Sequence, residues 1–229
     1  MLGPAEMTAI WLSLRVALFA TLCALPLAIW VAYILARKQF PGHQLLNVLV
    51  HLPLVMPPVV TGYLLLVLFG QQGPIGGVLQ QVFGFSFAFR WTGAALAAAV
   101  MAFPLMVRAI RLGFEAVDKG LEDAAKTLGA SRLRVFRTVT LPLVFPGILA
   151  ATVLGFAKAL GEFGATITFV AAIPGETQTI PTAIYGLLQV PGSEPAIVAL
   201  VGVSIVLAAG ALLVSEVLAR RMARRVGGQ

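Results

Sequence analysis

Five long apolar segments leave this chain few ways to fold. They cover residues 9–36, 45–70, 91–110, 143–173 and 195–219. A helix needs about 20 mostly apolar residues to cross the hydrocarbon core of a bilayer. A backbone in lipid must satisfy its own hydrogen bonds, and runs of this length indicate helices rather than barrel strands. The sequence therefore predicts an all-α integral membrane protein with five transmembrane helices.

The composition agrees with a membrane domain. Charged residues make up 11% of the 229 residues and the mean hydropathy is +0.97, whereas soluble domains carry about 25% charged residues. The first segment has no basic leader and ends in Arg37 and Lys38 without a clear cleavage pattern, so we do not expect a removable signal peptide. We expect residues 1–229 to form one transmembrane domain embedded in the lipid bilayer.

The basic residues predict an orientation. Most of the 16 Lys and Arg residues follow the first segment, lie between the third and fourth segments, or follow the fifth, while Arg90 stands alone on the opposite side. Cytoplasmic loops are enriched in Lys and Arg. We therefore expect a multi-pass protein with its N-terminus outside and its C-terminus in the cytoplasm. Nucleic-acid binding is a minor alternative, and we expect no nucleic-acid partner.

Residues 111–142 form the longest polar interruption between apolar segments. An apolar stripe at helical spacing runs through it: Phe114, Val117, Leu121, Ala125 and Leu128. Residues three and four apart share one helix face. Gly129 can end this helix as a left-handed cap, and Ser131 can cap the next one. A solvated loop is the alternative, but the stripe and the turn favour a compact knob that docks onto a partner.

No arrangement of catalytic residues stands out. His43 and His51 are the two histidines, and no His, Cys or carboxylate cluster has metal-ligand spacing. No glycine-rich phosphate loop ends in Lys-Ser or Lys-Thr. We expect no catalytic site, no metal site and no cofactor bound by this chain, and we place any nucleotide hydrolysis on another subunit.

Prolines interrupt the second segment. Pro53, Pro57 and Pro58 remove backbone donors and bend a helix, which frees carbonyl groups. Freed carbonyls are tolerated at membrane depth where they face protein or a water-filled cavity. Thr61 and Gly62 follow. The residues alone leave open a bend that lines a transport pathway and a simple packing kink.

The fourth segment places Lys158 and Glu162 close to its centre. An ionisable residue there costs roughly 2.5–3.5 kcal/mol on insertion scales. The two lie four apart, so they share a helix face and can neutralise each other. We favour a buried structural ion pair. The alternative is that Lys158, with Thr166 and Thr168, helps a divalent oxyanion to cross.

The polar interruption resembles the EAA signature of the permease subunits of ABC importers. That signature reads Glu-Ala-Ala, three residues, Gly, nine residues, Ile, one residue, Leu-Pro. The matching residues here are Asp123, Ala124, Ala125, Gly129, Val139, Leu141 and Pro142. Asp replaces Glu and Val replaces Ile, and Glu122 is the adjacent acid.

The resemblance implies a MetI-like type I ABC importer permease fold, in which this loop forms a coupling helix that sits in a cleft of the ATPase subunit. The implied ATPase-coupling residues are Val117, Leu121, Glu122, Asp123, Ala124, Ala125, Leu128, Gly129, Arg132, Leu141 and Pro142.

Two further stretches narrow the resemblance. Residues 51–63 and 160–181 are similar to the molybdate permeases of the ModB type. The candidate pathway residues in and near them are Pro57, Pro58, Thr61, Gly62, Lys158, Gly161, Glu162, Phe163, Gly164, Thr166 and Thr168. Sulfate and tungstate permeases share the Gly-Glu-Phe-Gly piece, so permeases for sulfate, thiosulfate or tungstate are the alternatives.

This resemblance also implies partners and a mechanism. The expected assembly is a homodimer of this subunit in a bacterial cytoplasmic (inner) membrane, with two copies of an ATPase that carry ATP-Mg. A periplasmic or surface molybdate-binding protein would deliver the substrate for import by alternating access. A passive anion channel and a membrane structural or signalling subunit are the rival classes, of which the channel has no use for a docking knob.

Overall fold

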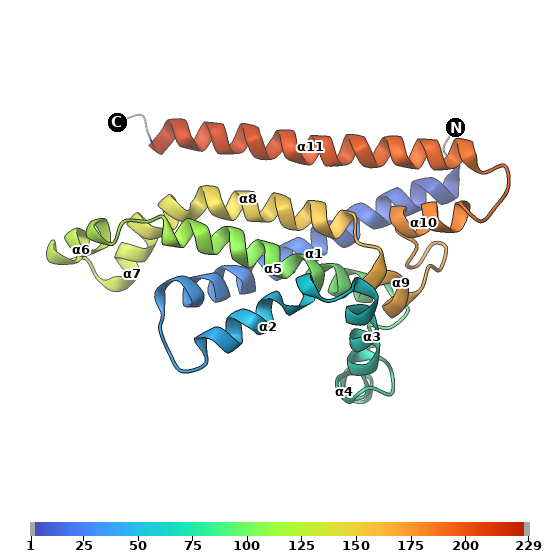
Figure 1. Ribbon diagram of the computed structural model, residues 1–229, viewed down its shortest axis with the longest axis horizontal. Helices are drawn as coiled ribbons and strands as arrows, with labels where there is room; N and C mark the ends of the chain where they lie inside the picture. The colour runs from blue at the N-terminus through green and yellow to red at the C-terminus, as the bar shows by residue number, and fades with distance from the viewer. Residues whose placement is uncertain (1–2, 227–229) are drawn as a thin grey trace.

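All the regular secondary structure that the computed structural model describes, within residues 3–226, is helical (Figure 1). In chain order the elements are α1 (Pro4–Arg37), α2 (His43–Val55), α3 (Pro58–Phe69), α4 (Pro74–Phe83), α5 (Trp91–Glu115), α6 (Lys119–Thr127), α7 (Arg132–Val135), the π-helical turn η1 (Phe136–Thr140), α8 (Leu141–Leu160), α9 (Gly164–Val170), α10 (Ile180–Leu187) and α11 (Glu194–Val226).

The number of apolar helices agrees with the predicted fold class. Four helical stretches within the described residues are long and apolar enough to cross a membrane: Pro4–Arg37, Trp91–Glu115, Arg132–Leu160 and Glu194–Val214. The pair α2 and α3 passes the same test together, which raises the number of crossings to five if the pair is one span. The predicted orientation of the termini stays a prediction.

The second predicted segment is broken. Instead of one helix over residues 45–70, α2 and α3 meet at an angle of 113°. Met56 and Pro57 adopt extended conformations, with ψ of 146° and 133°. Each of them precedes a proline, and the ring of the following proline disfavours the helical region for that residue. Two consecutive prolines therefore force the break.

The fourth predicted segment also differs from expectation. The segment 143–173 is not one helix, because α8 ends at Leu160 and α9 begins at Gly164. Lys158 consequently lies in the last turn of α8, and Glu162 lies in the break that follows it. The Glu162 carboxylate accepts a hydrogen bond from the Ala165 amide at 3.1 Å. Since a side chain that binds a free amide favours a new helix start over continuation, Glu162 stabilises the break.

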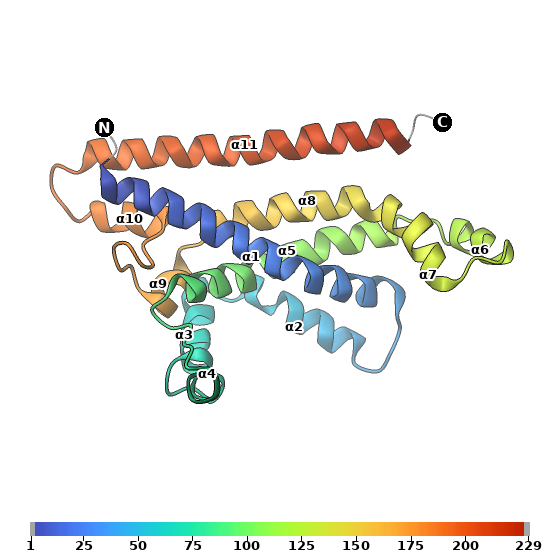
Figure 2. The ribbon, with the colours of Figure 1, turned by 180° about the vertical axis from the view of Figure 1, so that it is seen from behind.

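Helix α5 forms the centre of the bundle and packs between α1 and α8 (Figures 1 and 2). Its buried face is rich in small side chains: Gly93, Ala94, Ala95, Ala97, Ala98 and Ala102. Small residues let helices approach closely in lipid, where van der Waals contact and not water exclusion drives association. Nearer its end, Phe114 is fully buried and packs edge-on against Tyr33 of α1.

The connections at the other end of the bundle carry short helices. Helix α4 occupies the first connection and α10 the second. Ser13 of α1 accepts a hydrogen bond from the Ile180 amide at 2.7 Å, and both residues are buried. This bond attaches the start of α10 to α1.

We predict that Gly62→Ala destabilises the protein. A Cβ at Gly62 would lie 2.5 Å from the Ala165 carbonyl oxygen and 2.8 Å from its Cα. These are backbone atoms of α9, so α3 and α9 must separate, at about 1–3 kcal/mol. Thermal unfolding in detergent should show a lower Tm. Gly202→Ala on α11, where nothing lies within 4 Å, is the matched control, and equal Tm values for both variants would contradict this packing.

Candidate coupling site and transport pathway

The polar knob comprises α6, α7 and η1, at the end of the molecule beyond α5 and α8 (Figure 1). Asp118 begins α6, because its Oδ1 accepts a hydrogen bond from the Gly120 amide at 2.8 Å. Gly129 has φ of +84°, which confirms the left-handed cap. Ser131 accepts a hydrogen bond from the Arg134 amide at 3.4 Å, as expected of the cap of the next helix.

The apolar stripe does not lie on a single helix. Helix α5 ends at Glu115 and α6 starts at Lys119, because Asp118 caps a new helix between them. Phe114 and Val117 are buried in the core, whereas Leu121 and Leu128 are 51% and 89% exposed. The first part of the stripe thus anchors the knob, and the second part presents apolar side chains to a partner. Val117 is too buried to touch a partner directly.

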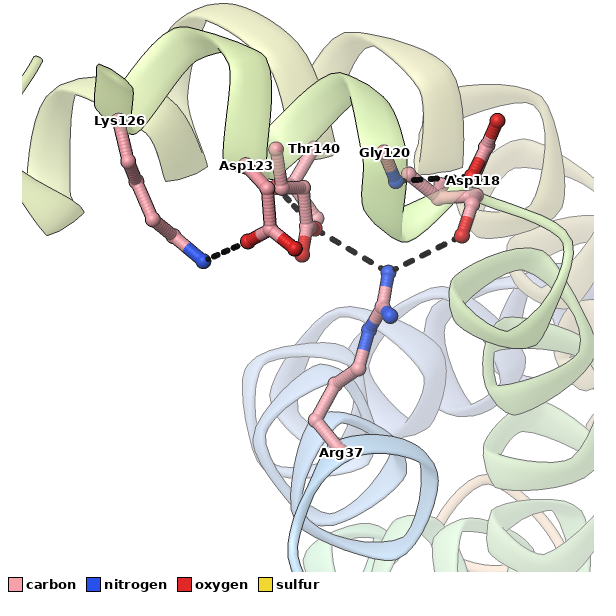
Figure 3. A network of polar contacts seen from close by, with 8 residues as sticks. Arg37, Asp118, Gly120, Asp123, Lys126 and Thr140 are labelled. Carbon is pink, nitrogen blue, oxygen red and sulfur yellow. Dashed lines mark hydrogen bonds and ion pairs between the residues drawn. The ribbon is translucent and has the colours of Figure 1, made fainter.

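A partly buried ion pair attaches α6 to the rest of the protein (Figure 3). Arg37, at the end of α1, donates from Nη2 to Glu122 Oε1 at 3.1 Å and to the Val117 carbonyl at 3.4 Å. Thr140 donates to the same Glu122 oxygen at 2.7 Å. The side chains of Arg37 and Glu122 are only 10% and 16% exposed. Glu122 therefore joins α1, α6 and η1 at one point.

Asp123, which stands where the signature has Glu, has a different environment. It is exposed and accepts a hydrogen bond from Lys126 Nζ at 2.7 Å. This hydrogen bond and the charge of Lys126 hold the pKa of Asp123 below its usual range. The acid that stabilises the knob is thus Glu122, and Asp123 faces outward. Sequence reasoning had not connected Arg37 with Glu122, since 85 residues separate them.

The remaining predicted coupling residues divide by exposure. Ala125 and Leu141 are partly buried, and the exposed members are Ala124, Leu128, Gly129, Arg132 and Pro142. The exposed set forms the tip and the α7 side of the knob. A partner would meet these residues first.

The structure brings candidate pathway residues from the second and fourth segments together. A Cβ at Gly164 would lie 2.7 Å from the Pro58 Cβ, and one at Gly62 would meet both Ala165 and Thr168. The two breaks in the spans therefore pack against each other through α3 and α9. Thr61 is buried there, and its hydroxyl has no hydrogen-bond partner among residues 3–226. Thr61 is thus the candidate with an unused polar group.

Lys158 and Glu162 form the predicted ion pair, with 2.6 Å between Nζ and Oε2. The Glu162 side chain is 2% exposed and that of Lys158 is 29% exposed. Both oxygens of Glu162 have protein partners, since Oε1 accepts from the Ala165 amide. Thr166 is buried as well. This arrangement favours the structural interpretation, because Glu162 is fully used in stabilising the break between α8 and α9.

Two more candidates lie close to this break. Gly161 is exposed where α8 ends, and the Phe163 ring packs against Tyr185 of α10 with 5.1 Å between centroids. Among the described residues no group of three or more His, Cys, Asp or Glu side chains is placed to hold a metal ion.

The chain is a helical membrane bundle with a broken second span and a projecting helix pair. Residues 24–224 match the family described as the binding-protein-dependent transport system inner membrane component, and the chain belongs to this family. It is 59% identical over 222 residues, 97% of each chain, to the molybdenum transport system permease protein ModB of Escherichia coli K12.

Two other comparisons extend this result. The chain is 38% identical over 200 residues to the sulfate transport system permease protein CysT of Salmonella typhimurium, covering 86% of this chain and 71% of that one. The fold is similar to that of the MetNI methionine ABC transporter in inward facing conformations, with a TM-score of 0.69 and 13% identity over 95% and 94% of the chains. The MetI-like fold is thus confirmed.

Family membership settles the class of activity. The chain is a multi-pass inner membrane protein that serves in transport and is not an enzyme. A substrate-binding protein and an ATPase on a separate subunit are its functional partners.

We predict that Glu122→Gln loosens the knob. Removing one partner of a partly buried ion pair leaves Arg37 without its counter-charge, at a cost of about 1–3 kcal/mol. Hydrogen exchange of residues 119–140 should become faster. Asp123→Asn removes the neighbouring acid but only an exposed pair, so its exchange should match that of the wild type. Equal acceleration in both variants would refute the anchoring role.

We also predict that Lys158→Met lowers stability more than it lowers turnover per folded molecule. The substitution leaves the Glu162 carboxylate without its cation in a buried position. Thermal unfolding should show the loss, and Lys158→Arg should restore most of it. A variant with wild-type Tm and abolished uptake would instead make Lys158 a transport residue.

Proposed function

We propose that this protein is the permease subunit of an ATP-driven importer that moves molybdate across the cytoplasmic membrane by alternating access. The observation that carries the mechanism is the knob, which exposes Leu121 and Leu128 and whose base is fixed by the Arg37–Glu122 ion pair. The similarity to a molybdenum permease over 97% of the chain supports the substrate.

The knob has the properties of a coupling element. An exposed Leu128 is unfavourable in water, and docking into a partner would remove its apolar surface from solvent. Because Glu122 ties α6 to α1 and η1, a displacement of the tip moves the ends of two long helices. In the proposed assembly, ATP-Mg bound by the ATPase drives this displacement.

The proposed orientation places the N-terminus outside and the C-terminus in the cytoplasm. The knob then lies in the cytoplasm with most of the basic residues, in agreement with the enrichment of Lys and Arg in cytoplasmic loops. The connections that contain α4 and α10 face the opposite side. They form the docking surface for a periplasmic or surface molybdate-binding protein.

The proposed assembly contains two copies of this subunit and two ATPase subunits. In the single chain, α2 and α11 leave many large apolar side chains uncovered, including Val55 at 82% and Val198 at 71% exposure. Lipid and the second subunit would cover these faces. The pathway would follow the breaks at Pro57 and Gly161.

Sulfate, thiosulfate and tungstate are the alternative substrates. The similarity to a sulfate permease supports sulfate as the second candidate, and tungstate has the same charge and shape as molybdate. A passive anion channel is less consistent with the chain, because a channel needs no docking element for an ATPase.

We predict that Leu128→Ala weakens association with the ATPase roughly thirtyfold and lowers ATP-dependent uptake, since about 2 kcal/mol of apolar burial is lost. Copurification and uptake assays measure both effects. Leu212→Ala on α11 truncates an equally apolar side chain, 61% exposed, outside the knob. If Leu128→Ala associated with the ATPase as strongly as the wild type does, the tip of the knob would not be part of the ATPase interface.

The substrate is tested in proteoliposomes that hold this subunit, its ATPase and the binding protein. We expect molybdate, and not sulfate, to stimulate ATP hydrolysis and to be taken up. Stimulation by sulfate would keep the importer and change its substrate. Uptake without any dependence on ATP would refute the importer and favour the channel.

A further inference from the structure

A polar hollow of about 280 Å³ lies between α2 and α5, apart from the knob and from the α3–α9 contact. Its lining residues are Asn47, His51, Arg108, Arg111, Leu112 and Glu115. A hollow lined by five polar side chains is unexpected in a chain with 11% charged residues. None of these residues belongs to the coupling or pathway sets.

The contacts in this hollow fix one arginine and leave the other free. Arg111 donates from Nε to Glu115 Oε1 at 2.6 Å and from Nη1 to Asn47 Oδ1 at 3.1 Å. His51 donates from Nδ1 to the Asn47 carbonyl at 2.8 Å, since a carbonyl oxygen only accepts. Arg108 is exposed and makes no hydrogen bond or ion pair with any residue that the structure describes. Arg111 is therefore held in place by Glu115 and Asn47, and the Arg108 guanidinium is available to bind a ligand.

The chemistry of the lining suits an oxyanion. A guanidinium presents paired N–H donors that match the oxygens of a tetrahedral anion. The amide nitrogen of Asn47 is a further donor, because its Oδ1 is the group that binds Arg111. Glu115 offsets the charge of Arg111, which leaves about one net positive charge. A divalent anion is attracted to such a site but not held tightly.

The hollow lies on a direct course from the break in the second span to the coupling end. Asn47 and His51 are four apart and share one face of α2. Pro57 lies six positions after His51, which corresponds to about 9 Å along a helix. Arg108 and Arg111 belong to the last turns of α5, directly before the knob. The hollow is thus beyond the break, on the knob side.

We propose that this hollow is the exit site for the transported oxyanion, where Arg108 receives the anion after it passes the break and before it leaves on the coupling side. The inference rests on the proposed function for the identity of the substrate. The single uncompensated charge explains how the site can attract the anion and still release it. Arg108 binds the anion, and Arg111 is a positioning residue held by Glu115 and Asn47.

The test uses the whole complex in vesicles with the binding protein and molybdate inside and ATP outside, so that the coupling end faces the bath. Tungstate added to the bath is the probe, and inhibition of ATP hydrolysis is the readout. We expect Arg108→Gln to weaken inhibition by tungstate roughly fivefold. In Arg108→Lys the inhibition constant should stay within about twofold of the wild-type value, because Lys keeps the charge but lacks the paired N–H donors of the guanidinium. Glu115→Gln should strengthen inhibition severalfold, since it adds a net positive charge.

Lys38→Gln is the matched control, because Lys38 is an exposed cation at the end of α1 and does not line this hollow. It should leave inhibition by tungstate unchanged. Equal inhibition constants for Arg108→Gln, Glu115→Gln and Lys38→Gln would overturn the exit site while the wild type still transports. If the wild type showed no molybdate-dependent ATP hydrolysis, both the proposed function and the exit site would be refuted.

A lipid phosphate has the same chemistry and is the other possible source of the anion. The assays are therefore run in vesicles of phosphatidylcholine alone and in vesicles that also contain phosphatidylglycerol. An effect of Arg108→Gln in both compositions supports the exit site. An effect confined to vesicles with phosphatidylglycerol would make Arg108 a lipid contact and overturn the proposal.

Discussion

The structure depends on one constraint, which is that backbone groups within lipid need partners inside the protein. Two spans are broken, near Pro57 and Gly161. The breaks are possible because α3 and α9 pack against each other through Gly62 and Gly164, so the irregular backbone is covered by protein. Each irregular segment thus covers the other. Together they place polar backbone groups and the buried Thr61 hydroxyl within the membrane domain.

The knob follows a different rule, since it lies where water is available. Its helices are short and individually weak, and their arrangement is maintained by Glu122, Arg37 and Thr140. The arrangement of the knob therefore does not depend on the signature residues alone. The position before the signature acid provides the attachment, and the exposed tip provides the surface for a partner.

The sequence predicted the features that depend on local chemistry. The apolar segments, the caps at Gly129 and Ser131 and the Lys158–Glu162 pair follow from spacing and residue type. The break at Pro57 was indicated as a bend, but its packing against α9, which is distant in sequence, was not. The Arg37–Glu122 contact and the hollow around Arg108 join elements far apart in the chain, and no local pattern reveals which residues meet.

The hydrogen bond between Ser13 and Ile180 makes α1 the link between α10 and the knob. Helix α1 is attached to α10 near one end and to the knob through Arg37 at the other, about 36 Å away along a helix axis. Between these two attachments α1 also packs against α5 and α8. Pro26 lies about midway between them and lacks a backbone donor, so the helix that touches both ends of the molecule has one fewer backbone hydrogen bond at its middle.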